Sequence, residues 1–390
     1  MKIENLNFCS GCHACYSTCP KSAITMDENL EGFLYPQIDK TKCVGCGLCE
    51  KVCPVIEPLK NHNENPIVNA AINNDEKTRL ESSSGGIFTA IAEKVLDAGG
   101  VVFGAKFADD FSVIHSWTES REGLTDFRGS KYLQSIIGNS YKDCKNFLLA
   151  GRKVLFSGTP CQIQGLKKFL GKEYENLLCM DVICHGVPSN MVWQKYIDLI
   201  LKKNGKTRSD VTKTSFRRKN EGWKKYSLAF TFKDASEYSE NQLKGWWMLT
   251  FNKNIMMRSS CYDCCAKDKH IISDFTVGDF WGIEAYLSDY DDKGTSIIYV
   301  NSAKGLKYFS DIGDKLKATR IDDYNAERYN TQLIKSIKAN KNRNAFFNVC
   351  LSNGFEHAYK KYVKPKLYIR IYKLVRRSFG KILRTIGIRK

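Results

Sequence analysis

Sixteen cysteines are the residues of this 390-residue chain best suited to carry chemistry, and eight of them fall between Cys9 and Cys53. They form two copies of one pattern, CSGCHACYSTCP and CVGCGLCEKVCP. The shared spacing, C-x2-C-x2-C-x3-C-P, is the bacterial ferredoxin run, in which three cysteines bind one 4Fe-4S cluster and the fourth binds the other. It predicts two clusters. Cluster one takes Cys9, Cys12, Cys15 and Cys53, and cluster two takes Cys43, Cys46, Cys49 and Cys19.

Disulfides and zinc are the other uses of such cysteines. A disulfide framework usually belongs to a short chain in an oxidising compartment, which does not match this sequence. A pair of structural zinc sites is the remaining alternative, although such sites usually need only two cysteines per knuckle.

Four further cysteines form a looser group. The segment KVLFSGTPCQIQGLKKFL predicts a strand, a tight turn and a helix, which places Thr159 and Cys161 at the carboxyl end of a strand, where ligands bind in open α/β sheets. By itself Cys161 fits a nucleophile or a plain buried thiol. A third 4Fe-4S cluster needs four cysteines, and the set available is Cys161, Cys184, Cys261 and Cys264, called the third set below. A zinc site and unrelated core cysteines are the alternatives.

A glycine-containing turn supplies a candidate anion site. In ESSSGGIFTAIAEKVLDAGG, Ser82 to Ser84 stand at the start of an expected helix, and Gly85 and Gly86 let a ligand approach its free N–H groups. Serine caps followed by glycines are also common without any ligand, so both interpretations stay open.

The elements that must position these residues follow from the hydrophobic pattern. SAITM and GFLYPQI predict two short strands, and from Ile67 onward strands and helices alternate. Helices are expected at about 87–98, 141–150, 162–170 and 190–203, a hairpin at 213–232, and less regular helices after Gly245. This order predicts an α/β core with a mixed, partly parallel sheet, preceded by a small ferredoxin-like α+β domain and followed by a basic C-terminal helix.

The expected domain limits are a two-cluster domain at 1–58, a linker at 59–66, two parts of an oxidoreductase domain at 67–150 and 151–330, and a helical region at 331–390. No run of 18 to 20 apolar residues and no signal peptide is visible, so a reducing cytoplasm is expected.

The formal charge of +18 is concentrated at one end. Residues 356–390 hold seven Lys and five Arg against one Glu, a net +11. From Leu367 to Lys390 apolar residues recur at helical spacing among these cations, a layout typical of a helix lying on anionic lipid. The alternative is a helix packed on the core with a solvated basic face. Nucleic acid is the least favoured partner, because no binding motif accompanies the charge.

A family resemblance joins several of these motifs. SSGGIFTAI, RGSKYLQS, VLFSGTPCQIQGLKKFL, DVICHGVPS and CYDCCAKDKHIISDFTVGDFWG, together with the cysteine repeat, resemble the coenzyme F-420 hydrogenase/dehydrogenase beta subunits. The resemblance runs from about Cys9 to Gly282. It implies an FAD near iron–sulfur clusters, which receives electrons from them and passes a hydride to an acceptor.

The resemblance also implies roles for individual residues. FAD is expected against Ser84, Gly85, Gly86, Lys131, Gln134 and Thr159, with a flavin phosphate or ring nitrogen as the partner of Lys131. It favours the third set as a cluster beside the flavin. His185 is a candidate proton donor or a residue packed behind Cys184, and Asp279 is a further candidate. Cys144, Cys179, Cys265 and Cys350 are expected to be ordinary thiols.

The resulting hypothesis is an FAD and iron–sulfur oxidoreductase of an anaerobic cytoplasm. A ferredoxin or another electron donor would supply it, and coenzyme F-420 or another small molecule would be its acceptor. Two alternatives are an electron-transfer subunit that serves a partner enzyme, and an iron–sulfur redox sensor held on membrane or nucleic acid by the basic tail.

Overall fold

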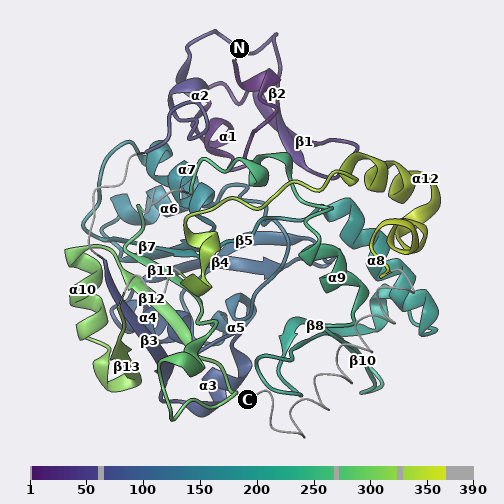
Figure 1. The fold of residues 1–390 in the computed structure, drawn as a ribbon. Coiled ribbons are helices and arrows are strands. Elements are labelled where there is room, and N and C mark those ends of the chain that lie inside the picture. The colour runs from purple at the N-terminus through teal and green to yellow at the C-terminus, as the bar shows by residue number, and fades with distance from the viewer. Residues whose placement is uncertain (1, 60–65, 268–271, 323–327, 366–390) are drawn as a thin grey trace, which may run out of the picture.

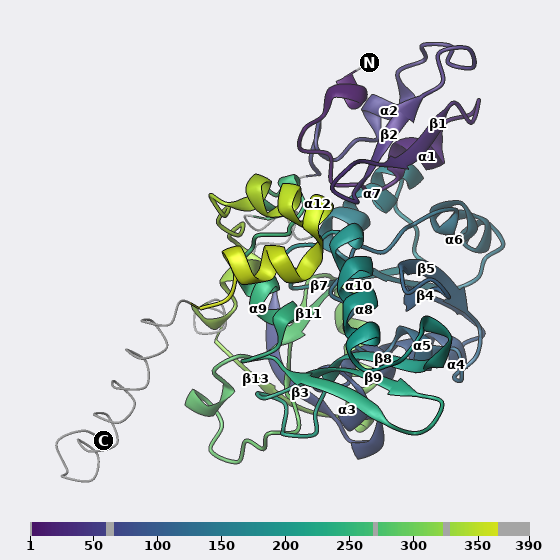
Figure 2. The same ribbon diagram turned by 90° about the vertical axis from the view of Figure 1, so that its right-hand side faces the viewer.

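The computed structural model describes residues 2–59, 66–267, 272–322 and 328–365. A small N-terminal domain stands on a layered α/β core, and a second, smaller sheet with its own helices flanks that core (Figures 1 and 2). The basic pattern from Leu367 to Lys390 lies outside the described residues, as does most of the expected linker at 59–66.

The N-terminal domain contains one hairpin and two short helices. Its hairpin pairs β1 with β2 in antiparallel register from Ile24 opposite Ile38 to Glu28 opposite Leu34, as the two expected strands predict. The bounds are α1 Ala14–Thr18, β1 Ile24–Glu28, β2 Leu34–Ile38 and α2 Leu48–Lys51. Because so small a domain buries few apolar side chains, chiefly Ile3, Ile24 and Cys49, it depends on other contacts for stability.

An eight-stranded sheet forms the centre of the core, in the order β13-β3-β12-β11-β7-β6-β4-β5. Strands β4, β6, β7 and β11 run parallel to one another. The remaining neighbours pair in antiparallel fashion: β5 with β4, β12 with β11, β3 with β12, and β13 with β3. The strand bounds are β3 Ile67–Asn73, β4 Val101–Phe107, β5 Val113–Thr118, β6 Val154–Gly158, β7 Leu177–Val182, β11 Phe275–Asp279, β12 Ser296–Val300 and β13 Leu316–Arg320. The expected mixed, partly parallel α/β sheet is confirmed.

Helices cover both faces of the sheet because its parallel strands are apolar on both sides. One face packs against α4 and α5, and the other packs against α6 and α7. The bounds are α3 Glu76–Glu81, α4 Ile87–Asp97, α5 Leu124–Phe127, α6 Ser140–Leu149, α7 Pro160–Leu170 and α10 Ala303–Ser310. Helix α7 also contacts α1, so the N-terminal domain rests on this side of the core (Figure 2).

The flanking unit contains a three-stranded antiparallel sheet in the order β10-β9-β8, and it shares a large apolar cluster with the neighbouring helices. Its bounds are α8 Asn190–Lys203, β8 Val211–Arg218, β9 Ser227–Phe232, β10 Glu237–Asn241, α9 Trp246–Asn252 and α12 Arg343–Tyr362. The expected hairpin is therefore extended by a third strand.

The expectation of less regular helices after Gly245 is wrong in part, because strands β11, β12 and β13 follow α9. Strand β12, SIIYV, is buried throughout between β11 and β3, and that position favours β-branched and aromatic residues. No helix in the described ranges has both the length and the apolar character needed to cross a bilayer.

Candidate functional site: cysteine groups and an adjoining cavity

The eight cysteines of the N-terminal repeat surround two separate small cavities. One cavity is lined by Cys9, Cys12, Cys15 and Cys53, and the other by Cys19, Cys43, Cys46 and Cys49. Each cavity thus contains all four cysteines that the ferredoxin spacing assigns to one cluster. The crossing of the fourth cysteine from each run into the other group is reproduced.

The two cysteine groups differ in their exposure. Cys12 of the first group is buried against the core, whereas Cys46 of the second group is exposed. Backbone N–H groups already point at sulfur: the Gly11 N–H donates to Cys9 Sγ over 3.3 Å, and the Ala23 N–H donates to Cys19 Sγ over 3.3 Å. Such donors stabilise thiolate sulfur.

The third set comes together from three distant stretches of chain. Cys161, Cys184 and Cys261 are each partly buried, and burial raises the pKa of every one of these thiols, that of Cys261 to about 12. Cys264 adds to the rise in all three, because neighbouring thiolates repel one another. Among the described residues, no three His, Cys, Asp or Glu side chains converge on a position suited to a single metal ion.

Cys265, expected to be an ordinary thiol, lies between the first group and the third set. Its neighbours include Cys264 of the third set and Cys12 and Cys53 of cluster one. Helix α7 passes equally close: a Cβ on Gly165 would lie 3.0 Å from Cys12 Sγ. The cluster-one cysteines and the third set are therefore neighbours across the domain boundary.

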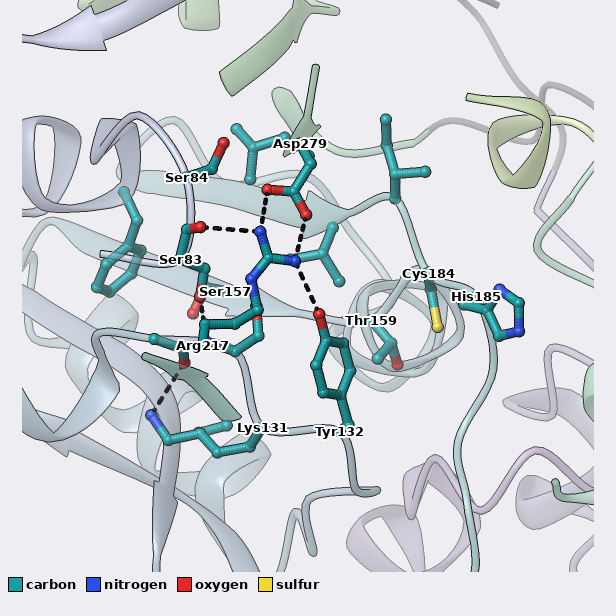
Figure 3. A pocket seen from close by; sticks show the side chains of 18 of the residues that line it. Ser83, Ser84, Lys131, Tyr132, Ser157, Thr159, Cys184, His185, Arg217 and Asp279 are labelled. Atoms are coloured by element: carbon teal, nitrogen blue, oxygen red, sulfur yellow. Dashed lines mark hydrogen bonds and ion pairs between the residues drawn. The ribbon is translucent and has the colours of Figure 1, made fainter. Parts of the chain in front are cut away.

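A cavity of about 630 Å³ opens at the carboxyl ends of the parallel strands. Thr159 follows β6, Cys184 and His185 follow β7, and Asp279 ends β11. Because parallel strands end at the same edge of a sheet, these residues line one cavity, and Figure 3 shows them around it. Cys184 belongs both to the third set and to the cavity wall, so the two sites adjoin.

The serine and glycine turn forms another wall of the cavity, at the N-terminus of α4. Ser84 Oγ donates to the Thr295 carbonyl over 2.8 Å, and the Gly85 N–H donates to Ser296 Oγ over 2.9 Å. Gly85 lies too close to β3 for a side chain, because a Cβ there would lie 2.3 Å from the Ala71 carbonyl oxygen. Gly86 begins the helix in the left-handed region with φ +84.

A buried ion pair occupies the middle of the cavity wall, with Arg217 from β8 and Asp279 from β11 (Figure 3). Two Arg217 N–H groups donate to the two Asp279 oxygens over 2.9 Å each. Arg217 also donates to Tyr132 Oη over 3.0 Å and to the Ser83 carbonyl over 3.1 Å. Burial alone would lower the pKa of Arg217, but the Asp279 carboxylate together with Tyr132 and Tyr226 raises that pKa above its ordinary value.

Two arginines on this wall keep an unused donor. The Nε–H groups of Arg128 and Arg217 are buried and have no hydrogen-bond partner among the residues that the structure describes. Buried polar groups without partners are rare in native proteins and often indicate a missing ligand or water. Together with the α4 N-terminus, these donors are suited to an anionic group.

Two of the residues expected to contact FAD have other partners. Lys131 lines the cavity, but its Nζ donates to the carbonyls of Asp126, Arg128 and Gly129, and burial lowers the pKa of Lys131 to about 7. Gln134 points to the N-terminal domain, where its Nε2 donates to the Ser10 carbonyl over 2.7 Å.

The histidines are held in polar networks. His185 lines the cavity and shares a 2.7 Å hydrogen bond between Nε2 and Asn254 Oδ1, while burial lowers its pKa. His115, which the sequence did not single out, is buried beneath the cavity. Its Nε2 donates to the Ser157 carbonyl and its Nδ1 accepts from Ser135 Oγ, both over 2.7 Å.

Thr159, which was expected to contact FAD, is the N-cap of α7 and forms a capping box with Gln162.

Comparison with known proteins agrees with this geometry. Residues 8–56 match the 4Fe-4S dicluster domain, and residues 151–324 match the C terminus of the coenzyme F420 hydrogenase/dehydrogenase beta subunit. The fold and the cysteine groups thus define an iron–sulfur redox protein. Its core carries the C-terminal domain of the coenzyme F420 hydrogenase/dehydrogenase beta subunit, and a 4Fe-4S dicluster domain precedes it.

Three curated proteins illustrate the relationship. One subunit of the F(420)H(2) dehydrogenase of Methanosarcina mazei is 22% identical over 367 residues, which are 89% of this chain and 94% of that protein. Coenzyme F420-dependent sulfite reductase of Methanocaldococcus jannaschii is 27% identical over 197 residues, half of this chain but only 30% of that protein. The VorC subunit of ketoisovalerate oxidoreductase from Methanothermobacter marburgensis is 33% identical over 58 residues, 14% of this chain and 73% of that protein.

Among solved structures, a chain of the F420-reducing [NiFe] hydrogenase complex from Methanosarcina barkeri is similar. The superposition covers 71% of this chain and 92% of that chain, with 15% sequence identity and a TM-score of 0.46.

Proposed function

We propose that this chain is an oxidoreductase that passes electrons from a one-electron donor through three 4Fe-4S clusters to FAD, and from there to a small-molecule acceptor. The observation that carries the proposal is the continuity of the sites. The cluster-two group adjoins the cluster-one group within one small domain, Cys265 connects cluster one to the third set, and Cys184 connects the third set to the cavity.

The cavity fits FAD in size and in donor chemistry. Its volume lies within the usual range for ligand sites, and its wall offers an anionic group the α4 N-terminus and the partnerless Nε–H groups of Arg128 and Arg217. When bound, a flavin supplies the conversion between single electrons and a hydride pair, which iron–sulfur clusters alone do not provide.

The protein groups have distinct tasks in this proposal. Arg217 and Arg128 bind the anionic part of the cofactor, and Asp279 fixes the Arg217 guanidinium. Lys131 orders the loop that follows α5 through its three carbonyl bonds, and so acts as a positioning residue. His185 stands beside Cys184 at the cavity wall and holds or supplies a proton near the acceptor.

Electron entry is proposed at cluster two, the outermost group. Val44 and Leu48 flank the exposed Cys46 and are themselves 63% and 40% exposed. The exposed lysines near these residues are Lys21, Lys40, Lys42 and Lys51. An apolar patch with basic neighbours suits an acidic donor of the ferredoxin type.

The composition of the purified protein tests the proposal. Anaerobic purification should give about twelve iron atoms and about one FAD per chain. An iron content of about eight atoms per chain would show that only two clusters are present and would contradict the third cluster. A protein that is purified without flavin and does not bind added FAD would refute the proposal that the chain is a flavoenzyme.

An electron-transfer subunit is the second candidate, favoured by the alignment over 94% of a relative that is named as a dehydrogenase subunit. Steady turnover of an acceptor by the isolated chain with dithionite would support the enzyme, whereas loaded cofactors without turnover would support the subunit.

Contact of residues 367–390 with anionic membrane stays a proposal from the sequence pattern. Truncation at Lys366 should then abolish liposome flotation without changing the iron content.

A further inference from the structure

Five Arg and Lys side chains are buried within the described residues, and they divide into two kinds. Three pair with a carboxylate, as expected for a charge removed from water. These are Arg79 with Asp291, Arg217 with Asp279 and Arg343 with Glu31. The other two, Arg258 and Lys267, have no carboxylate within 4.0 Å in the described part of the chain.

Arg258 is fully buried between cluster one and the third set. Its Nε–H donates to the Cys9 carbonyl over 2.6 Å, and its other N–H groups donate to the Leu34 carbonyl over 2.7 Å and to Gln134 Oε1 over 3.1 Å. Its charge also acts on Cys261 of the third set. The guanidinium is therefore held by neutral acceptors while cysteines of two groups lie beside it.

Lys267 is the second cation, and its side chain is buried beside Cys184 of the third set. Its Nζ donates to the Cys184 carbonyl over 2.5 Å and to the Gln332 carbonyl. Its charge acts on Cys184. Each of the two buried cations without a carboxylate thus lies beside a cysteine of the third set, Arg258 beside Cys261 and Lys267 beside Cys184.

Burying a cation without a counter-charge is costly, so a protein retains one where an anion compensates it. We propose that Arg258 is a shared counter-cation for cluster one and the third cluster, and that Lys267 is a counter-cation for the third cluster alone. A cluster with four thiolate ligands is anionic and gains a further negative charge on reduction. A fixed cation beside it stabilises the reduced form and raises its reduction potential. This inference rests on the proposed function for the clusters, but not on the flavin.

Redox titration of the anaerobic holoprotein, followed by electron paramagnetic resonance, tests the inference. Arg258→Gln should lower the equilibrium constant for reduction at least tenfold, which is 59 mV for one electron, at both cluster one and the third cluster. It should leave cluster two unchanged. Lys267→Gln should lower the equilibrium constant for reduction only at the third cluster. Arg258→Lys, which keeps the charge, should keep most of the wild-type potential.

The matched control is the double variant Glu31→Gln/Arg343→Gln, which removes a buried bidentate pair where the N-terminal hairpin meets α12. Because that charge is already neutralised, all three potentials should stay within threefold in equilibrium constant. Equal shifts at all three clusters, or no shift in Arg258→Gln, would overturn the inference. If Arg258→Gln does not fold, Lys267→Gln still tests the role of Lys267, and Arg258→Lys tests the role of Arg258. Because Arg258→Lys keeps the charge, a tenfold fall in its equilibrium constant for reduction would overturn the inference for Arg258. If the iron content shows only two clusters, Arg258→Gln must still lower the equilibrium constant for reduction at cluster one. A failure of the proposed function is therefore distinguishable from a failure of this inference.

Discussion

Replacing Arg217 with glutamine tests the anion site in the cavity. Arg217 holds Asp279 through two 2.9 Å bonds and is almost completely buried, so its loss leaves a buried carboxylate without a partner. Breaking one side of such a pair typically costs about 3–5 kcal/mol of folding free energy. The single variant would therefore confuse lost binding with lost stability.

The double variant Arg217→Gln/Asp279→Asn separates the two effects. It removes both charges, and the new amides can still bond to each other and to Trp223, whose indole N–H donates to Asp279 over 2.8 Å. Replacing a buried pair with neutral groups is often close to neutral for stability. The anionic ligand, however, loses a charged hydrogen bond worth about 1.5–3 kcal/mol, which corresponds to FAD binding weakened about ten- to hundredfold.

The assay is fluorescence titration of FAD into flavin-depleted protein, with the iron content and the thermal unfolding temperature measured on the same sample. The double variant should unfold near the wild-type temperature, hold the same iron and bind FAD at least tenfold more weakly. Wild-type FAD affinity in a folded double variant would refute the assignment of Arg217 to the anion site. Asp279→Asn alone keeps the guanidinium and should retain FAD, and it serves as a second control when its unfolding temperature and iron content match those of the wild type.

Two other predictions concern the buried histidine and the donor surface. Burial lowers the pKa of His115 from its ordinary 6.5 to about 4, so the folded state resists protonation. The neutral imidazole therefore contributes about 3 kcal/mol to the free energy of unfolding above pH 6.5, and this contribution is lost as the pH falls toward 4. Chemical unfolding at a series of pH values should show that the free energy of unfolding of His115→Gln depends less on pH between 6.5 and 4 than that of the wild type. Val44→Asp should slow reduction by an acidic ferredoxin at least fivefold without changing reduction by dithionite. Leu30→Asp is the matched control, since Leu30 is 82% exposed on the hairpin turn away from cluster two, and equal slowing in both variants would contradict the docking site.

Local pattern was enough to predict much of the fold. Helix α8 has the expected limits, Asn190–Lys203, because a serine cap precedes a clear apolar periodicity. The two cysteine runs predicted which four cysteines line each of the two small cavities, because the ferredoxin spacing is a local geometric constraint, and their role as cluster ligands stays a prediction. Strand β12 was missed, because the flanks of a short apolar run do not distinguish a buried strand from a helix.

Contacts between distant segments were beyond the sequence. Arg217 and Asp279 lie 62 residues apart, and Arg258 reaches the Cys9 carbonyl across 249 residues. Nothing near Arg258 in the chain distinguishes it from a solvated arginine. Gln134 illustrates the same limit: the family resemblance directed it to the flavin, and the fold directs it to the loop of cluster one.

The missing side chain of Gly165 has a consequence for how electrons travel. Helix α7 approaches Cys12 so closely that even a methyl group would meet its sulfur, and Arg258 and Gln134 hold the same loop from the other side. A domain fixed in this way has no swing between a loading position and a delivery position. Transfer from cluster one into the core should then depend on a constant tunnelling gap rather than on diffusion of a tethered carrier, so solvent viscosity should leave its rate unchanged.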